Sequence, residues 1–462
     1  MSTTSVPATH ASPPVTGRKT AWAEGLDELR AAATTEPGRL RVIGALLALL
    51  VVVFGAVTAW QVADRAAAAD DVVTHSQPLT SDAASIYRSL ADADTTAAAG
   101  FLAGDKESVA TRERYATDIS TASALLVKAA ANSGGSDGAG AQIAKLNSRL
   151  PRYTGLVETA RANNRQGLPL GGAYLRYANE QMRKELLPAA RALYDAETDR
   201  LAADYGAAKA RPWCALAAGV VAIGALGWAQ RRHYRRTNRV FNRGLLAATA
   251  ASVVVLVWLV AGHTVARAAL TGSYEHGARS LRVLNEARID ALQARGDENL
   301  TLVARGAVLT GGQEDFYEAG FRSGMADLAG GGGHGAAAAK SRLGAALALA
   351  DDEAGRRPVR TALTQVRQWQ VRHGAARAAD DQGDYEQALA KVIGTGGSTG
   401  ESFDRVAAGL QQALVHEQEE FRSAADSGRG ALGGLPVGAG VLAGLAAVGA
   451  VLGIGRRLAE YR

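Results

Sequence analysis

The chain has 462 residues, of which 47% are hydrophobic and 21% charged, and its formal net charge is +6. Cys214 is the only cysteine, so no disulfide can form within the chain. The excess of basic over acidic residues lies in short segments beside apolar stretches, which argues against nucleic acid as a partner and for contact with anionic lipid.

Residues 1–41 form a mostly polar segment whose opening part, rich in Ser, Thr and Pro, is expected to be disordered. The segment is too long for the charged region of a cleavable signal peptide, and no small-residue cleavage site follows the next apolar stretch. That stretch is therefore expected to remain as a membrane anchor. Residues 21–33 place Trp22, Leu26 and Leu29 at helical spacing and are a candidate contact for lipid or a cytoplasmic partner.

Four apolar stretches dominate the chain, and each is close to the ~20 residues that an α-helix needs to cross a bilayer. None of them contains a charged side chain. They occupy residues 42–62, 213–229, 245–262 and 435–454. The sequence therefore predicts an all-α integral membrane protein with four transmembrane helices, located in the plasma membrane.

The placement of arginines predicts the orientation. The connector between the second and third stretches, residues 230–244, has no acidic residue and contains Arg231, Arg232, Arg235, Arg236, Arg239 and Arg243. Because Lys and Arg in short flanking segments stay in the cytoplasm, the connector, residues 1–41 and residues 455–462 should face inward. Residues 63–212 and 263–434 should then form two extracytoplasmic domains. The segments assigned inside hold 14 basic and five acidic residues, whereas the rest of the chain holds 37 and 40.

Two interpretations of the connector arginines remain open. They fix the topology and contact lipid headgroups, or they also form a docking surface for a cytoplasmic partner.

The two outer segments are expected to be helical bundles, because Pro is scarce in them and good helix formers dominate. Glycine-rich turns divide each segment into four helices of roughly 25–35 residues. Apolar residues recur at bundle spacing in both segments, at Leu175, Met182, Leu186 and Leu193 and at Leu284, Ala287, Ala291 and Ala294. Pro78 is expected to interrupt the helix that leaves the first stretch, and Pro188 to kink the last helix of the first bundle.

Short sequence motifs (words of a few residues each) recur in the same order in both outer segments. Ala160-Arg161-Ala162 returns as Ala376-Arg377-Ala378 at an offset of 216, and offsets in other words range from 207 to 222, growing along the chain. The order and the growing offsets predict an internal duplication. Chance similarity between two alanine-rich helical regions is the alternative. Two such units in one chain are able to pair as an internal pseudo-dimer, which the sequence leaves open.

The fourth apolar stretch carries glycine pairs spaced four apart, including Gly440 with Gly444 and Gly449 with Gly453. Such pairs allow close contact between transmembrane helices, here on opposite faces of one helix. The alternative is composition alone, because the chain contains 53 glycines.

No catalytic or cofactor motif is found. The eight histidines are scattered, with no pair at helical spacing to hold a metal, and no phosphate-binding loop or dinucleotide motif is present. The acidic clusters at residues 351–353 and 417–420 are expected on solvated helix faces. The apolar stretches lack the ionisable residues that transporters bury. We therefore expect no enzyme, no cofactor and no metal.

Two words stand where one helix should end and the next begin: Leu102-Ala103-Gly104-Asp105 and Val308-Leu309-Thr310-Gly311. They resemble the Leu-Thr-Gly-Asp-like turn in the four-helix ligand-binding domains of chemoreceptors and sensor kinases. The first copy has Ala103 in place of Thr, and the second has Gly312 where Asp would stand.

The whole layout resembles an actinobacterial family of four-crossing membrane proteins with two outer helical domains. Members act between a glutamine-binding lipoprotein and a soluble serine/threonine kinase of the G type. The resemblance implies a non-enzymatic sensor that relays recognition outside the cell to an effector inside it. The alternative is a structural scaffold of the cell envelope.

Overall fold

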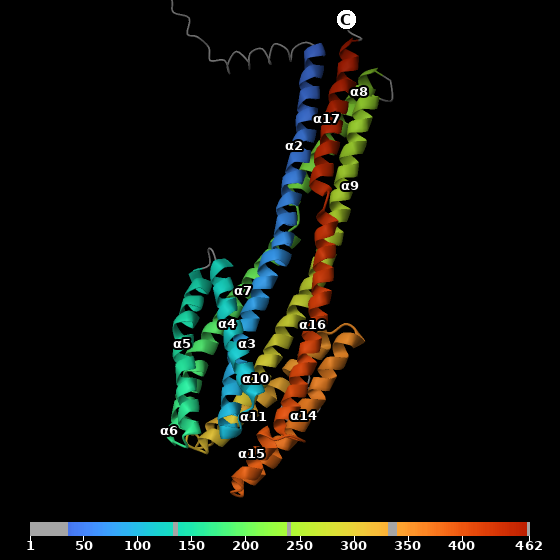
Figure 1. Ribbon diagram of the computed structural model, residues 1–462. Helices are drawn as coiled ribbons and strands as arrows, with labels where there is room; N and C mark the ends of the chain where they lie inside the picture. The colour runs from blue at the N-terminus through green and yellow to red at the C-terminus, as the bar shows by residue number, and fades with distance from the viewer. Residues whose placement is uncertain (1–35, 133–136, 238–241, 331–339, 460–462) are drawn as a thin grey trace, which may run out of the picture. The chain divides into compact units, whose positions relative to one another are not determined.

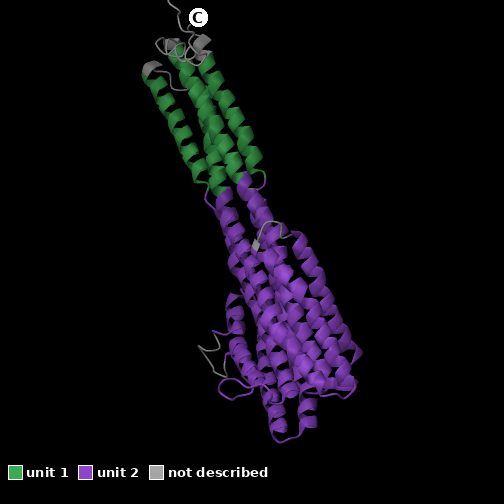
Figure 2. Ribbon diagram, turned by 90° about the vertical axis from the view of Figure 1, so that its left-hand side faces the viewer, with its two compact units in different colours: residues 1–62, 212–261, 434–462 green, residues 63–211, 262–433 purple. Residues whose placement is uncertain are grey.

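The computed structural model describes residues 36–132, 137–237, 242–330 and 340–459. These residues are almost entirely helical, and their only β-type pairing is an isolated bridge between Leu309 and Asp315. The chain divides into a small unit, drawn green in Figure 2, and a large unit, drawn purple. The small unit lies within residues 1–62, 212–261 and 434–462, and the large unit comprises residues 63–211 and 262–433. The all-α prediction is confirmed.

The four apolar stretches lie in four helices that are long and apolar enough to cross a membrane. These helices are α2 (Glu36–Asp71), α8 (Trp213–Thr237), α9 (Arg243–Gly272) and α17 (Leu435–Ala459). Within the small unit they share a core in which Leu47, Leu226, Leu245 and Ala446 pack together. The rest of their surface is unusually apolar, and Trp60 is 68% exposed. An exposed apolar surface of this extent fits lipid contact.

The first helical group, residues 77–209, contains α3 (Gln77–Ala103), α4 (Val109–Asn132), α5 (Asp137–Arg165), α6 (Leu170–Gln181) and α7 (Leu187–Lys209) (Figure 1). These helices pack on one another around residues such as Leu90, Leu126 and Leu146. The apolar seam predicted for this group is buried as expected, because Leu175, Met182, Leu186 and Leu193 are at most 2% exposed.

The second helical group, residues 279–432, departs from four simple helices. It contains α10 (Arg279–Ala304), α11 (Phe316–Ala329), α13 (Arg342–Leu349), α14 (Glu353–Asp381), α15 (Tyr385–Ile393) and α16 (Thr399–Leu432). Its predicted seam, from Leu284 to Ala294, is buried. The third helix expected here, between the glycine-rich turns at residues 330–335 and 394–400, is divided into α13, α14 and α15. Asp384 starts α15 by accepting a hydrogen bond from the Gln387 N–H at 3.0 Å.

The two chemoreceptor-like motifs, at residues 102–105 and 308–311, lie at different places relative to the ends of the helices before them. Residues 102–104 end α3 as predicted, and Gly104 has a positive φ of 60°. Residues 308–311 lie beyond the end of α10, so the prediction that this word ends a helix is wrong. The helix stops earlier because Arg305 and Gly306 adopt left-handed backbone conformations, with φ of 48° and 75°.

The helices pass through both prolines without a break, contrary to the interruption predicted at Pro78. A short π-helix precedes each proline: η1 (Val72–Ser76) lies before Pro78, and η3 (Met182–Leu186) lies before Pro188. Proline cannot donate to the carbonyl four residues back, and a π-helix shifts the hydrogen bonds to five residues back. A third π-helix, η4 (Ser273–Ala278), joins α9 to α10 at the place where η1 joins α2 to α3.

Two connections lead from an apolar helix into a helical group, and both of these incoming connections are continuous helix. The two outgoing connections, which lead from a helical group back into an apolar helix, are interrupted. The chain is helical from α2 through α3 and from α9 through α10. Residues 210–212 separate α7 from α8, and Gly433 and Gly434 separate α16 from α17. Arg65 on α2 and Arg267 on α9 donate to the carbonyl oxygens of Ala210 at 2.8 Å and Lys209 at 3.0 Å, which hold the first outgoing break.

The two helical groups pack on each other inside the large unit, chiefly through α3 and α10. The Thr95 hydroxyl donates to the Leu292 carbonyl oxygen at 3.0 Å. The Asn299 amide donates to the Thr95 carbonyl oxygen at 3.2 Å, and the Gln293 amide to the Tyr87 hydroxyl at 3.0 Å. The first helix of each group therefore forms the main contact between the groups.

A buried acid occupies a matching place in each group. In the first group Asp94 accepts hydrogen bonds from the Tyr153 hydroxyl at 3.1 Å and from the Asn179 amide at 2.6 Å. In the second group Glu298, 1% exposed, accepts from the Trp369 indole at 3.1 Å and pairs with Arg295. Each acid thus lies on the first helix of its group and binds an aromatic donor from α5 or α14.

Repeated ion pairs accompany these acids. Arg161 on α5 pairs with Glu107 at 3.2 Å, and Arg377 on α14 pairs with Glu318 at 3.4 Å. Both arginines belong to the repeated Ala-Arg-Ala word, and both acids lie at or near the start of the second helix of their group.

Candidate functional site

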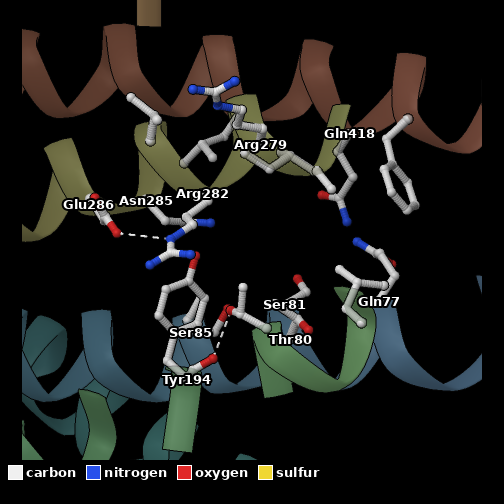
Figure 3. Close-up of a pocket in the computed structure, with 18 of the residues that line it drawn as sticks. Gln77, Thr80, Ser81, Ser85, Tyr194, Arg279, Arg282, Asn285, Glu286 and Gln418 are labelled. Atoms are coloured by element: carbon white, nitrogen blue, oxygen red, sulfur yellow. Dashed lines mark hydrogen bonds and ion pairs between the residues drawn. The ribbon is translucent and has the colours of Figure 1, made fainter. Parts of the chain in front are cut away.

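A cavity of about 590 Å³ lies between the two helical groups of the large unit. Its walls come from α3 and α7 of the first group and from α10, α13 and α16 of the second, with η4 at one side. Figure 3 shows these walls facing each other across the open space. A cavity of this size is typical of sites for small molecules.

The α3 wall presents a row of polar groups. Gln77, Thr80, Ser81 and Ser85 recur at spacings that place them on one helix face, so all four line the cavity. In Figure 3 Gln77 and Gln418 point toward one another from opposite walls. These hydroxyls and amides both donate and accept hydrogen bonds, so they suit a polar ligand.

The lining is rich in arginine: it includes Arg88, Arg191, Arg279, Arg282 and Arg342. Glu286 is the only acidic residue among the lining residues, and its side chain is 7% exposed. Its carboxylate lies 2.8 Å from Arg342, 3.2 Å from Arg282 and 3.5 Å from Arg191. Arg191 also pairs with Asp195 and Arg342 with Asp290, each at 3.3 Å, so the five lining arginines are balanced in part by carboxylates that lie outside the lining.

Arg88 is another of these lining arginines. It makes no hydrogen bond or ion pair with any residue that the structure describes, and its guanidinium interacts at longer range with Asp118 and Asp92. Burial lowers the pKa of Arg88, although those two carboxylates oppose the shift. Nearby, burial and the charge of Arg88 lower the pKa of Arg288 to about 10. The shift of Arg88 thus reports burial, whereas that of Arg288 also reports the positive charge of its neighbours.

A second cavity of about 290 Å³ lies beside the first and shares Arg191 with it. Two buried carboxyl groups line it, Asp94 and Asp297, and Arg183 forms an ion pair with Asp297. Burial raises the pKa of both carboxyls to about 6, and the hydrogen bonds to Asp94 and the charge of Arg183 limit the shift. These two acids therefore titrate nearer to neutral pH than ordinary aspartates do.

One group in the described part of the chain has the geometry of a cation site. Ligand atoms of Asp352, His416 and Glu420 lie within 4.8 Å of one another. The sequence predicted no metal because no histidines pair at helical spacing, and these residues come together only when α14 meets α16. Asp352 also has an ordinary role, since its carboxylate caps α14 by accepting from the Gly355 N–H at 2.7 Å.

The acidic cluster at residues 417–420 is not uniformly solvated. Glu417 is 3% exposed, so its predicted place on a solvated face is wrong. Burial raises the pKa of its carboxyl to about 7, and a hydrogen bond with Ser280 counteracts part of the shift. The physical reason is that α16 turns this position toward α10.

The connector arginines are only partly described. Arg231, Arg235 and Arg243 are exposed, and the Arg232 guanidinium lies 5.3 Å from the centre of the Trp228 ring. The side chain of Arg236, all of Arg239 and the amphipathic stretch at residues 21–33 lie outside the described residues. The two interpretations of the connector therefore both stand.

The glycines of α17 divide into two kinds. A Cβ on Gly449 would lie 3.3 Å from the Gly244 carbonyl oxygen, and one on Gly453 would lie 2.9 Å from the Gly244 Cα. Open space surrounds Gly440 and Gly444, which are exposed. Of these two pairs, the 449/453 pair lies where α17 meets α9.

The large cavity itself was not predicted from the sequence. Its polar residues come from six elements, and none of them forms a recognisable motif. One signal was available: Gln77, Thr80, Ser81 and Ser85 interrupt a helix face that a simple bundle would fill with apolar side chains.

Comparison with known proteins agrees with a sensing role. Residues 68–206 match the family model of the actinobacterial sensor domain. No curated protein and no solved structure matches the chain. The matched residues include nearly all of the first helical group, and together with the four apolar helices they indicate a multi-pass membrane protein of the sensor type.

Proposed function

We propose that the protein is a non-enzymatic membrane sensor that relays recognition of an extracytoplasmic ligand or ligand-binding protein to a separate cytoplasmic effector. The observation that carries this proposal is the match of residues 68–206 to a sensor-domain family. The cavity between the helical groups supports it, because a sensor needs a place where a ligand distinguishes two arrangements.

The helix pattern suggests how the signal travels. A shift of α3 or α10 would be passed along the same continuous helix into α2 or α9. The outgoing helices are interrupted at residues 210–212 and at Gly433–Gly434, so they tolerate such a shift without following it. Small displacements of packed helices are an established form of switching.

The proposed topology places the large unit outside the cell and both termini inside, on the basis of the connector arginines. We assign the output to a separate cytoplasmic protein.

We also propose that the two helical groups are four-helix bundles derived from one duplicated unit and paired as an internal pseudo-dimer. Corresponding side-chain contacts in the two helical groups support this proposal. The buried acids Asp94 and Glu298 bind aromatic donors from corresponding helices, and Arg161 and Arg377 form corresponding ion pairs. Chance similarity does not require such matching contacts.

The partners follow from the family resemblance in layout. Outside, the partner is a solute-binding lipoprotein, and inside it is a serine/threonine kinase pathway that docks on the arginine connector or on residues 21–33. The exposed guanidinium groups of Arg231, Arg235 and Arg243 suit an acidic surface on that partner.

A structural scaffold of the cell envelope is the second candidate. The buried network around Glu298 favours it, because a fully satisfied polar core rigidifies the second helical group.

Gene deletion separates the two candidates. Strains lacking this protein, the neighbouring kinase or the neighbouring binding protein should share a phenotype when the external solute changes. Phenotypes without overlap, together with co-purification of wall or division proteins only, would instead establish the scaffold.

A further inference from the structure

We propose that the 590 Å³ cavity between the helical groups binds a small dicarboxylate, held by arginines from both groups. This inference rests on the proposed sensor function and names the ligand class of its site.

The charge of the cavity lining favours an anionic ligand. Glu286 pairs with Arg191, Arg282 and Arg342; Arg191 also pairs with Asp195 and Arg342 with Asp290, two carboxylates outside the lining. Arg88 has no direct partner among the described residues. The lining itself therefore holds five guanidinium groups and one carboxylate, and an incoming anion would form charge-assisted hydrogen bonds with groups that are half-exposed to the cavity. A cationic or neutral ligand would gain nothing from this lining.

The arginines of the lining come from both helical groups. Arg88 and Arg191 belong to the first helical group, whereas Arg279, Arg282 and Arg342 belong to the second. A ligand with two separated carboxylates can engage both sets at once, and each planar carboxylate matches the fork of a guanidinium. A compact anion with a single centre reaches only one wall.

The remaining lining is suited to the body of such a ligand. Thr80, Ser81 and Ser85 offer hydroxyl groups on the α3 wall, and Gln418 offers an amide from α16. A hydroxyl or carbonyl substituent on the ligand would therefore find hydrogen-bond partners (Figure 3).

Binding of this kind links the ligand to the relay. A dicarboxylate that bridges both helical groups binds best to the arrangement in which the two sets of arginines are correctly spaced. It therefore shifts the population toward that arrangement.

The test uses the purified full-length protein in lipid nanodiscs at low ionic strength, with titration calorimetry of the dicarboxylates succinate and L-malate. Inorganic phosphate serves as the compact anion. At least one carboxylate should bind more tightly than phosphate. Arg88→Gln should weaken this binding about tenfold or more, the loss expected for one charge-assisted contact.

Two further variants keep the test decisive. Arg279→Gln removes an exposed lining charge with little risk to folding and should also weaken binding. Glu286→Gln removes the competing carboxylate and should strengthen binding several-fold. Arg357→Gln, exposed and outside the cavity, is the matched control and should change nothing.

The proposal is overturned if none of the carboxylates binds at millimolar concentration, if phosphate binds as tightly, or if Arg357→Gln has the same effect as the cavity variants. A sensor that still responds in cells when Arg88→Gln has abolished binding would refute the ligand assignment alone and leave the relay intact.

Discussion

At the scale of single residues, the buried ions of the second helical group hold four helices together. Glu298 on α10 accepts from Trp369 and faces the His373 Nδ1 at 2.9 Å, both on α14. The other His373 nitrogen lies 3.1 Å from Glu318 on α11. Arg295 reaches the Thr399 hydroxyl at the start of α16 at 2.9 Å. Each charge in this network has a partner, as buried charges require.

Removal of one member should therefore be costly. We expect Glu298→Gln to destabilise the protein by about 3–5 kcal/mol, because Arg295 would remain buried without its counter-charge and His373 would keep only Glu318. Thermal unfolding of the purified protein measures this loss. Glu353→Gln, whose side chain is 66% exposed, is the control and should have almost no effect. Equal shifts in the two variants would show that the network contributes nothing special.

His373 makes stability depend on pH. Burial opposes its charge, but the hydrogen bonds and charges of Glu298 and Glu318 prevail and raise its pKa to about 9. Because the pKa is higher in the folded state, the stabilisation is fully present below about pH 6.5 and is lost as pH rises to about 9.

Thermal unfolding between pH 6 and pH 9 tests this sign. The melting temperature of the wild type should fall over that range, and His373→Gln should remove most of the decline. His416→Gln, which changes a more exposed histidine, is the comparison. A decline that persists unchanged in His373→Gln would mean that other groups carry the pH dependence.

At the scale of elements, close helix contact in the small unit depends on particular glycines. A Cβ on Gly244 would lie 2.4 Å from the Gly449 carbonyl oxygen, a distance that forces backbone to move. We expect Gly244→Ala to destabilise the helix pair. Gly444→Ala should be neutral or stabilising by up to about 1 kcal/mol, because open space surrounds it and Ala favours helix. Thermal unfolding in detergent distinguishes the two variants, and destabilisation of similar size in both would contradict this assignment.

Sequence patterns predicted some helices correctly and missed others. Hydrophobic period and length identified the apolar helices and both buried seams, because these signals are local. The division of the third expected helix into α13, α14 and α15 was missed, since it depends on capping residues such as Asp352 and Asp384. The short π-helices before Pro78 and Pro188 were also missed, because proline alone signals a break.

The site was less predictable than the fold. A cavity between two packed groups depends on which helices meet, and no local pattern encodes that choice. Arg88 and Glu286 lie far apart in the sequence, and only the packing of α3 on α10 places both in the wall of one cavity. Glu417 was misplaced for the same reason.

At the scale of the whole molecule, the proposed orientation can be tested with single cysteines in a Cys214→Ser background. Arg357→Cys should react with a membrane-impermeant maleimide in intact cells, because the large unit is proposed to lie outside. Arg231→Cys should react only after permeabilisation. The opposite labelling pattern would invert the topology and end the account of an external sensor.

The central claim is that the continuous incoming helices carry the signal. The most direct measurement is phosphorylation by the proposed kinase pathway after a change of external solute, in cells that express Ala268→Pro. Ala268 is exposed on the part of α9 that lies in the large unit, and proline there interrupts α9 before it reaches η4 and α10. With normal protein levels, the response should be lost in Ala268→Pro and kept in Ala268→Ser. A full response in Ala268→Pro would contradict the relay.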